Sequence, residues 1–271
     1  MLEKIKQHFA VATWLLWLSI RKQVEWILTL ISFAIALPIK CATGLVLIYV
    51  LVDKFSPLYG WSFNQLVFLY GLSYVSDGLA STFASQARRI EIYVTRGDFD
   101  RSLVRPISVL FQFLFRFIFL GGVMEVISGL IVLIYGYRLS GFSLTFVNIV
   151  KIAVVILGAT LIRVAYLIIV GSIAFWTKRS GPIVWVWDEI VRRTTQYPIT
   201  MYPQIFQALF TFILPFSFIS YYPCCDFYGF KSQFDLPLNF VFWTPVIGIF
   251  TFILANKIFN YGLKVYESAG A

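Results

Sequence analysis

The chain has 271 residues, of which 59% are hydrophobic and 13% are charged, and its mean hydropathy is +0.82. Soluble domains carry about 25% charged residues, so this chain lacks the charge needed to cover a water-exposed surface. Its apolar residues gather in runs of roughly 20, which is the length that a helix needs to cross the hydrocarbon core of a bilayer. Composition therefore predicts an all-α integral membrane protein. The alternating ten-residue segments typical of a membrane β-barrel are not seen in the sequence.

The net charge is +9, with a sequence pI near 9.5. In a soluble protein this excess would point to nucleic acid, but nucleic-acid binding requires a basic face in water. Here the basic residues lie in the connections between apolar runs, where they report the side of the membrane that each connection occupies. We therefore expect membrane lipids as partners and no nucleic acid.

Residues that bind metals or react with oxidants are few. The sequence has one histidine, His8, and three cysteines, Cys41, Cys224 and Cys225. No C-x-x-C or Cys/His spacing is present, so no metal site is predicted. The neighbouring Cys224 and Cys225 leave two interpretations open, a strained vicinal disulfide or two buried thiols at a helix end.

In chain order, residues 1–22 come first and have the pattern of an amphipathic helix at the membrane interface. Six apolar segments follow, each long enough to span the membrane. They cover residues 26–52, 63–83, 107–135, 144–176, 203–222 and 240–259. Pro38 predicts a kink in the first of these spans.

The distribution of Lys and Arg supports an even number of spans. The N-terminus, the connections after spans two and four, and the C-terminal tail together hold 15 of these residues, whereas the three opposite connections hold 3. Cytoplasmic loops carry the excess of basic residues, so both termini are predicted to lie in the cytoplasm. One missed or extra span would exchange the sides of the later connections and weaken this asymmetry.

Motifs for nucleotide binding and hydrolysis are missing from the sequence. It contains no P-loop, no G-x-S-x-G, no H-E-x-x-H and no paired carboxylates in a soluble loop. We therefore predict that the chain is not an enzyme and holds no cofactor of its own. If ATP drives its function, a separate subunit must hydrolyse it.

The most informative connection is segment 86–105, which is too polar to enter the membrane. It predicts a short helix, a break at Gly97 and a second short helix that Asp98 or Asp100 could cap. A compact helix between two spans can dock on a partner protein, with its arginines paired to carboxylates there. The alternative is a solvated loop whose arginines face lipid phosphates.

A second polar connection, 178–202, contains a helical pattern at 183–193. Its apolar face holds Ile183, Val184, Trp187, Ile190 and Val191, and its polar face holds Asp188, Glu189, Arg192 and Arg193. This pattern indicates a helix that lies against the inner leaflet or a second docking element.

Charged residues also occur within or near the predicted spans, namely Lys40, Asp77, Arg116, Glu125, Lys151 and Arg163. A charge at mid-bilayer costs about 2.5–3.5 kcal/mol on insertion scales, so each needs a partner, a cavity or an interface. The two acids are candidate partners for three of the bases, Lys40, Arg116 and Arg163. One interpretation is structural pairing, with snorkelling near the span ends. The other is a polar path for substrate along Lys40, Asp77, Arg116, Glu125 and Arg163.

After the amphipathic segment the chain carries three characteristic stretches: YVTRGDFDRSLVRPIS at 93–108, YPITMYP at 197–203 and FILPFSFISYYP at 212–223. In combination they resemble the type-2 ABC exporter permeases, in particular the small six-span family often encoded as paired permeases beside one ATPase. The resemblance covers nearly the whole chain.

The resemblance implies that segment 86–105 is a coupling helix that contacts the ATPase. The implied coupling residues are Arg88, Arg89, Glu91, Arg96, Gly97, Asp98, Asp100, Arg101 and Arg105. It also implies that the first helix is an elbow along the inner leaflet and that residues 223–239 form an outward re-entrant region.

A working unit of this family would contain two permease subunits, identical or paralogous, and two ABC ATPase subunits that bind ATP and Mg. It would lie in the bacterial inner membrane as a multi-pass assembly. It would move a hydrophobic or amphipathic substrate outward, such as a drug, toxin, lipid or peptide-like molecule.

Two other functions remain open on the sequence. An ion-coupled secondary transporter would use Asp77 or Glu125 as the carrier and would usually show internal repeats, which we do not see. A membrane-embedded lipid enzyme would need a catalytic cluster at one leaflet, and no His/Asp or carboxylate constellation is present.

Overall fold

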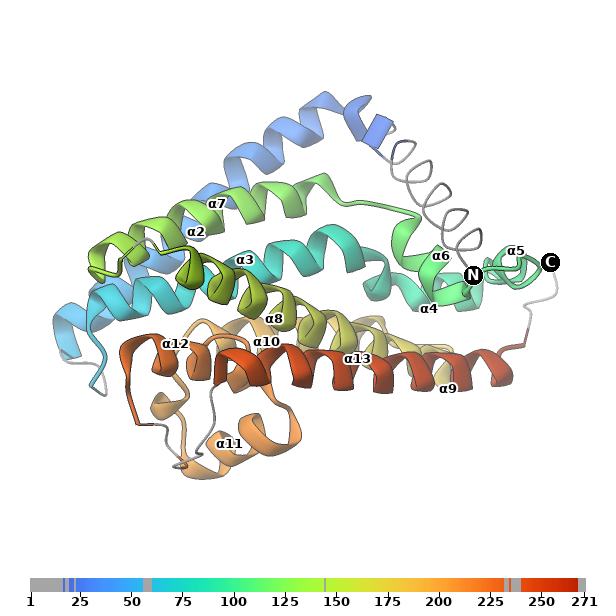
Figure 1. Cartoon of the computed structure of the whole chain (residues 1–271). Coiled ribbons are helices and arrows are strands. Elements are labelled where there is room, and N and C mark those ends of the chain that lie inside the picture. The colour runs from blue at the N-terminus through green and yellow to red at the C-terminus, as the bar shows by residue number, and fades with distance from the viewer. Residues whose placement is uncertain are drawn as a thin grey trace.

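The computed structural model describes residues 17, 20–21, 23–55, 60–143, 145–231, 234 and 240–267, and all regular elements among them are helices. Four of these helices are long and apolar enough to cross a membrane. They are α2 (Ile27–Phe55), α7 (Leu120–Leu139), α8 (Phe146–Ser172) and α13 (Phe240–Val265). Figure 1 shows the long helices running along one bundle. The prediction of an all-α membrane protein is therefore confirmed, with four candidate membrane-spanning helices among the described residues.

Helix α3 (Phe63–Ala84) runs through the centre of the bundle, and every residue from Leu66 to Gly78 in it is buried. At its first turn, the backbone N–H of Ser62 donates to Oε1 of Gln65 at 2.8 Å, which satisfies a donor that a helix start leaves unpaired. Helix α3 also places a carboxylate, Asp77, deep in the protein. A buried charge requires partners from neighbouring helices.

Helices α3 and α7 run antiparallel with their backbones in contact. A Cβ added to any of five glycines would lie only 2.5 to 2.8 Å from the backbone of the other helix. These are Gly71 and Gly78 on α3, and Gly122, Gly129 and Gly136 on α7. Their seven-residue spacing places them on one stripe of each helix, and small residues on such a stripe allow close packing of helices in membranes.

Helices α8 and α13 form a second close pair, which runs parallel. Gly158 of α8 lies against the backbone of Pro245, and near the other end Gly262 of α13 lies against the ring of Phe175. Phe175 belongs to α9 (Ala174–Thr177), a short continuation of α8. Apolar residues 146–177 thus form one stretch that contains both helices, close to the predicted span 144–176.

At one end of the bundle the chain folds into a group of short helices (Figure 1). They are η1 (Ser85–Arg89), α4 (Ile90–Thr95), α5 (Asp100–Leu103) and α6 (Val109–Phe115). Residues 116–119 then form a break before α7. The predicted third span, 107–135, is therefore not one helix but α6, this break and α7.

The predicted fifth span, 203–222, also differs from the structure. After α10 (Gly181–Thr195) and η2 (Ile199–Met201), the chain forms α11 (Gln204–Ala208), a π-helical turn η3 (Leu209–Ile213) and η4 (Phe216–Phe218). The apolar stretch Gln204–Ile213 is shorter than a span. The physical reason is Pro215, which has no N–H to donate and disfavours a helical backbone at Leu214. Figure 1 shows α11 to the side of α12 and α13.

The opposite end of the bundle is formed by α12 (Tyr221–Tyr228), which ends at Gly229 with a φ of +66°. Cys224 and Cys225 in this helix are buried free thiols, so the vicinal disulfide is not observed. The predicted outward region 223–239 begins within α12, and residues 235–239 lie outside the described residues, as does most of the predicted amphipathic helix 1–22.

Candidate functional site

The guanidinium of Arg163 on α8 lies at the centre of a buried polar network, with only 3% of its side chain exposed. Its Nη1 lies 3.4 Å from Oδ1 of Asp77 on α3. The remaining nitrogens donate to three hydroxyls: Ser76 Oγ at 3.1 Å, Ser73 Oγ at 2.8 Å and Thr195 Oγ1 at 2.6 Å. All three guanidinium nitrogens have partners, as burial of an arginine requires.

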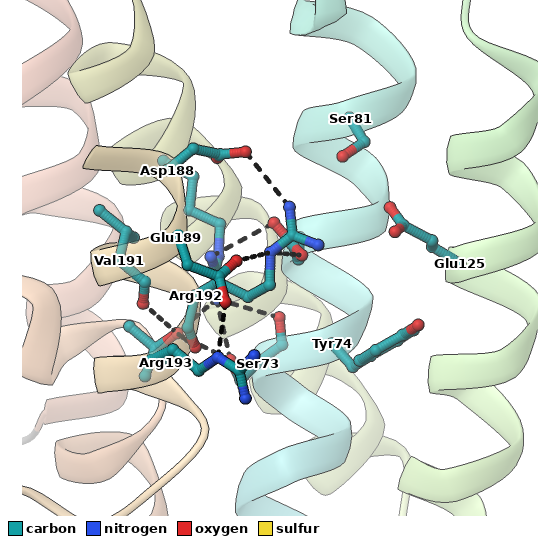
Figure 2. A network of polar contacts seen from close by, with 12 residues as sticks. Ser73, Tyr74, Ser81, Glu125, Asp188, Glu189, Val191, Arg192 and Arg193 are labelled. Carbon is teal, nitrogen blue, oxygen red and sulfur yellow. Dashed lines mark hydrogen bonds and ion pairs between the residues drawn. The ribbon is translucent and has the colours of Figure 1, made fainter. Parts of the chain in front are cut away.

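Helix α10 contributes a second arginine to this network. Nε of Arg192 lies 3.5 Å from Oδ2 of Asp77, so this carboxylate stands between two guanidinium groups. On its own helix Arg192 pairs with Asp188 at 3.2 Å, one turn away. Figure 2 shows Arg192 reaching from α10 toward the central helix, with Asp188 and Glu189 beside it.

Helix α10 therefore differs from the amphipathic helix predicted at 183–193. Its charged residues Asp188 and Arg192 face the bundle, whereas Ile183 and Ile190 on the expected apolar side are exposed. The buried apolar contacts are made by Val184 and Val191. The buried charges of Asp77 and Arg163 explain this orientation. They need partners, and the charged side chains of α10 supply them from inside the bundle.

The network continues to the start of segment 86–105. Arg88 of η1 binds Asp188 through two bonds, from Nε to Oδ2 at 3.0 Å and from Nη2 to Oδ1 at 3.3 Å. A bidentate arginine–carboxylate pair fixes orientation as well as distance. Asp188 thus joins Arg88 and Arg192, so a continuous series of ion pairs runs from η1 to the middle of the bundle.

Glu91 forms a second link between segment 86–105 and α10. Its Oε2 accepts the backbone N–H of Ser180 at 2.6 Å and that of Gly181, at the N-terminus of α10. These hydrogen bonds from Gly181 and Ser180 lower the pKa of Glu91 below its usual 4.5. The carboxylate also opposes the positive end of the helix dipole. Helix α10 is thus attached to α4 at its N-terminus and to η1 along its length.

Segment 86–105 has the predicted order of helix, break and helix. Gly97 has a φ of +72°, the left-handed conformation that glycine adopts without steric cost, and it separates α4 from α5. The prediction that Asp98 or Asp100 caps the second helix is wrong: the N-cap is Phe99, and no side-chain capping bond forms there. Asp100 is instead the first residue of α5.

Phe99 holds this segment against the bundle. Its ring is buried and packs against Phe113 of α6, Phe175 of α9 and Phe259 of α13, with centroids 5.4 to 5.9 Å apart. An anchor of this kind fixes the segment relative to three other elements, so that it moves with them as one body.

The outer surface of the segment combines apolar and basic side chains. Val104 is 84% exposed, and Ile92 and Leu103 are also exposed. Among them stand the exposed residues Arg96, Arg101 and Arg105. We call Ile92, Arg96, Arg101, Leu103, Val104 and Arg105 the knob surface. Exposed apolar residues rimmed by charge are typical of a protein interaction site.

A separate ion pair joins α2 to α7. Nζ of Lys40 lies 3.3 Å from Oε1 of Glu125, with 43% of the lysine side chain and 6% of the glutamate side chain exposed. Oε2 of Glu125 is buried without a hydrogen-bond partner among the described residues. Figure 2 shows Glu125 on the side of α3 opposite to α10.

Lys40 also lines a cavity of about 320 Å³ between α2, α3 and α10. The cavity walls include Lys40, Thr43, Tyr70, Tyr74, Arg192 and Tyr197. Two of these tyrosines connect α3 to α2, because the hydroxyl of Tyr70 donates to the carbonyl of Cys41 and that of Tyr74 to Leu37, each at 3.2 Å. The cavity therefore lies where polar and aromatic side chains meet inside the bundle.

The structure divides the five charges of the predicted polar path into three groups. Asp77 pairs with Arg163, and Glu125 pairs with Lys40. Both pairs are among the candidate pairings that the sequence offered. Arg116 joins neither acid, because it lies in the break before α7 with its guanidinium carbon 5.5 Å from the ring centre of Tyr93. A cation over an aromatic ring is stabilised by the charge distribution of the ring.

Sequence reasoning missed the contributions of Arg192 and Asp188, which it placed outside the membrane, and of Ser73, Ser76 and Thr195. The hydroxyls had one available signal: Ser73 and Ser76 lie at helical spacing beside Asp77 in an otherwise apolar segment. No group of three His, Cys, Asp or Glu side chains that could hold a metal ion occurs among the described residues.

Comparison with known proteins gives one finding. A family model described as "ABC-2 family transporter protein" matches residues 39–270. This range contains the whole polar network, segment 86–105 and the Lys40–Glu125 pair. No curated protein and no solved structure matches the chain.

Proposed function

We propose a function from the premise that this chain belongs to the ABC-2 family of transporter membrane proteins, whose model matches most of its length. The chain is accordingly a multi-pass membrane protein and a transport permease. Our proposal is that it is the membrane-spanning subunit of an exporter whose energy comes from a separate ABC ATPase. The single observation that carries this proposal is the exposed knob surface on a segment that is ion-paired to the centre of the bundle.

The need for an ATPase follows from what the chain lacks in its sequence. It contains no P-loop, so it cannot bind and hydrolyse ATP by the usual means. ATP and Mg would be bound by two ATPase subunits. A second permease, identical or paralogous, would complete the assembly in the bacterial inner membrane.

The knob surface suits the ATPase in both shape and charge. Val104 and Leu103 offer apolar contacts, and Arg96, Arg101 and Arg105 can pair with carboxylates on the partner. The remaining predicted coupling residues act inside this chain. Arg88 and Glu91 bind α10, while Gly97 makes the turn between α4 and α5.

Movement of the knob surface would reach the bundle through α10. Glu91 holds its N-terminus, Arg88 holds Asp188, and Arg192 extends the series to Asp77 on α3. We assign the fifth membrane crossing to α10 followed by η4 and α12, because Ser220 at the start of α12 donates to the carbonyl of Thr195 at the end of α10. Segment 86–105 follows the second crossing and carries five arginines, so we expect it to face the cytoplasm.

The cavity beside Lys40 is our candidate for part of the substrate path. It lies between α2, α3 and α10, and α10 is the helix that the knob surface would move. Its mixture of tyrosine rings and charged side chains suits an amphipathic molecule, which has both apolar and polar parts. Transport of such a molecule would run outward from the cytoplasm or the inner leaflet.

The test is co-purification of this permease with an ABC ATPase subunit. We expect the double variant Arg96→Glu and Arg101→Glu to weaken co-purification of the ATPase on the order of tenfold or more, because reversed charges would face its carboxylates. The stimulated ATP hydrolysis of the complex should fall with it.

A matched control is the double variant Arg138→Glu and Lys231→Glu, which reverses two exposed charges far along the chain from the knob surface. It should leave assembly and hydrolysis unchanged. If the Arg96/Arg101 variant assembles and hydrolyses ATP like the unmodified protein, the docking role of this segment is wrong.

A further inference from the structure

A second cavity lies at the end of the bundle where segment 86–105 begins. It has a volume of about 450 Å³ and is enclosed by the start of α2, by η1 and by the break before α7. It is separate from the cavity beside Lys40, with which it shares no lining residue. The proposed transport path makes no use of it.

The walls of this cavity are held by contacts between distant parts of the chain. Gln23 donates its side-chain amide to the carbonyl of Ile118 and accepts the N–H of Leu120 at 3.1 Å, which joins the residues just before α2 to the break and the first residue of α7. Phe33 of α2 packs edge-on against Phe119 at 5.1 Å, and the N–H of Phe119 donates to the carbonyl of Thr82 at 3.0 Å. The cavity is thus a built feature of three elements.

The lining of the cavity combines two kinds of chemistry. Its apolar wall is formed by aromatic rings, from Trp26, Phe33, Phe117 and Phe119. Its polar wall contains Arg88 and Arg89 and no acidic residue. Arg88 is already paired with Asp188, whereas Arg89 is exposed and has no ion-pair partner among the described residues.

A further polar group in this cavity lacks a partner. The hydroxyl oxygen of Ser85 is buried and makes no hydrogen bond within the described part of the chain. A buried hydroxyl without a partner is destabilising. Ser85 lines the same wall as Arg88 and Arg89, so a ligand oxygen beside the arginines would also satisfy this donor.

We propose that this cavity binds an anionic phospholipid of the inner leaflet, with its phosphate at Arg89 and Ser85 and its acyl chains against the aromatic wall. This proposal rests on the proposed function in one respect only, the placement of the cavity on the cytoplasmic side of the membrane. Basic pockets between membrane helices on the cytoplasmic side recognise anionic headgroups. Trp residues are enriched at the level of the headgroups. Trp26, 69% exposed at the start of α2, meets that condition.

A lipid explains both walls, whereas a free phosphate ion explains only one. Inorganic phosphate would leave the rings of Trp26 and Phe33 in contact with water, and an uncharged lipid would leave Arg89 and Ser85 without partners. A bound lipid would also contact α2 and η1 at the same time. It would therefore hold the start of segment 86–105 in place without touching the knob surface.

The experiment uses the full chain in detergent, stripped of lipid and then given dioleoyl-phosphatidylglycerol or dioleoyl-phosphatidylcholine, with bound lipid counted by native mass spectrometry. We expect phosphatidylglycerol to be retained and phosphatidylcholine to be lost. Arg89→Gln should lower retention about fivefold, the amount that corresponds to one basic residue near an anionic surface. Ser85→Ala should lower it less.

The control is Arg105→Gln, which removes an exposed arginine outside the cavity and should leave retention unchanged. An excess of inorganic phosphate should not displace the lipid. Equal retention of both lipids, displacement by phosphate, or unchanged retention in Arg89→Gln would each overturn the proposal. The measurement needs no ATPase and no transport, so its failure would leave the proposed function standing, and failure of ATPase docking would leave this site standing.

Discussion

The two ion-paired sites of the bundle, Asp77–Arg163 and Lys40–Glu125, differ in how completely they are enclosed. Arg163 and Asp77 are both almost fully buried, and three hydroxyls complete the coordination of the guanidinium. Lys40 is 43% exposed and lines a cavity. One carboxylate oxygen lacks a hydrogen-bond partner within the described chain at each site, on Asp77 and on Glu125, so the sites differ in burial and not in this respect. The first site has the features of a structural lock, and the second those of a site that can rearrange.

This difference also separates two groups of helices. The lock joins α3, α8 and α10, and through Arg88 it includes η1. The second site joins α2 to α7, and α2 is the least buried of the four long apolar helices, with 17% of its most apolar stretch enclosed. We infer that α3, α8 and α10 move as one body and that α2 moves relative to them.

The largest expected effect is that of Asp77→Ala. It would leave Arg163 and Arg192 buried together without their shared carboxylate, and breaking a buried pair in this way costs about 3–5 kcal/mol. Unfolding in detergent, followed by circular dichroism, would measure the loss. Adding Arg163→Leu should restore part of it, because the second change removes the unpaired charge. If the stability losses of Asp77→Ala and Arg163→Leu simply add in the double variant, the two residues are not coupled.

A smaller effect on stability is expected for Arg88→Ala, about 1–2 kcal/mol, since both Arg88 and Asp188 are partly accessible to water. The larger consequence should be functional. The ATPase should still bind, because the knob surface is intact, but its hydrolysis should no longer respond to substrate. A variant that couples normally would show that the ion pairs between η1 and α10 do not transmit movement.

For Lys40→Met we expect about 1 kcal/mol of destabilisation, because the partly exposed amine gains little from its pair but the buried Glu125 loses its partner. Transport in reconstituted vesicles should nevertheless change, since Lys40 lines the cavity. The same vesicles discriminate between energy sources. Transport that stops when the proton gradient collapses and continues without ATP would favour the ion-coupled alternative, with Asp77 or Glu125 as its carrier.

The smallest effect concerns pH. The pKa of Glu91 is lowered by the N–H groups of Gly181 and Ser180, so the folded protein binds a proton at Glu91 less readily than the unfolded chain does. Its contribution to stability is therefore present above the usual value of 4.5 and is lost as the pH falls through the lower folded value. Melting temperatures measured between pH 6 and about pH 3 should decline less steeply in Glu91→Gln than in the unmodified protein. Parallel curves would contradict this assignment.

The sequence by itself determined the class of the protein and its most exposed feature. Hydropathy over 20 residues is a local property, and it located the long apolar helices without knowledge of their neighbours. The order of helix, glycine break and helix in segment 86–105 is equally local, because Gly97 and the charges around it exclude both a longer helix and the membrane.

Only the tertiary structure decided which charges pair and which face of α10 is buried. Arg88 and Asp188 are 100 residues apart, and Arg163 and Asp77 are 86 apart, so no local pattern contains both members of either pair. The amphipathic pattern at 183–193 predicted the helix and the apolar face that contains the buried Val184 and Val191. It did not predict that Asp188 and Arg192 of the polar face also turn inward to pair with buried charges. Likewise the apolar run 203–222 met the length of a span, but Pro215 and the hydrogen bond from Ser220 to Thr195 folded it back onto the bundle.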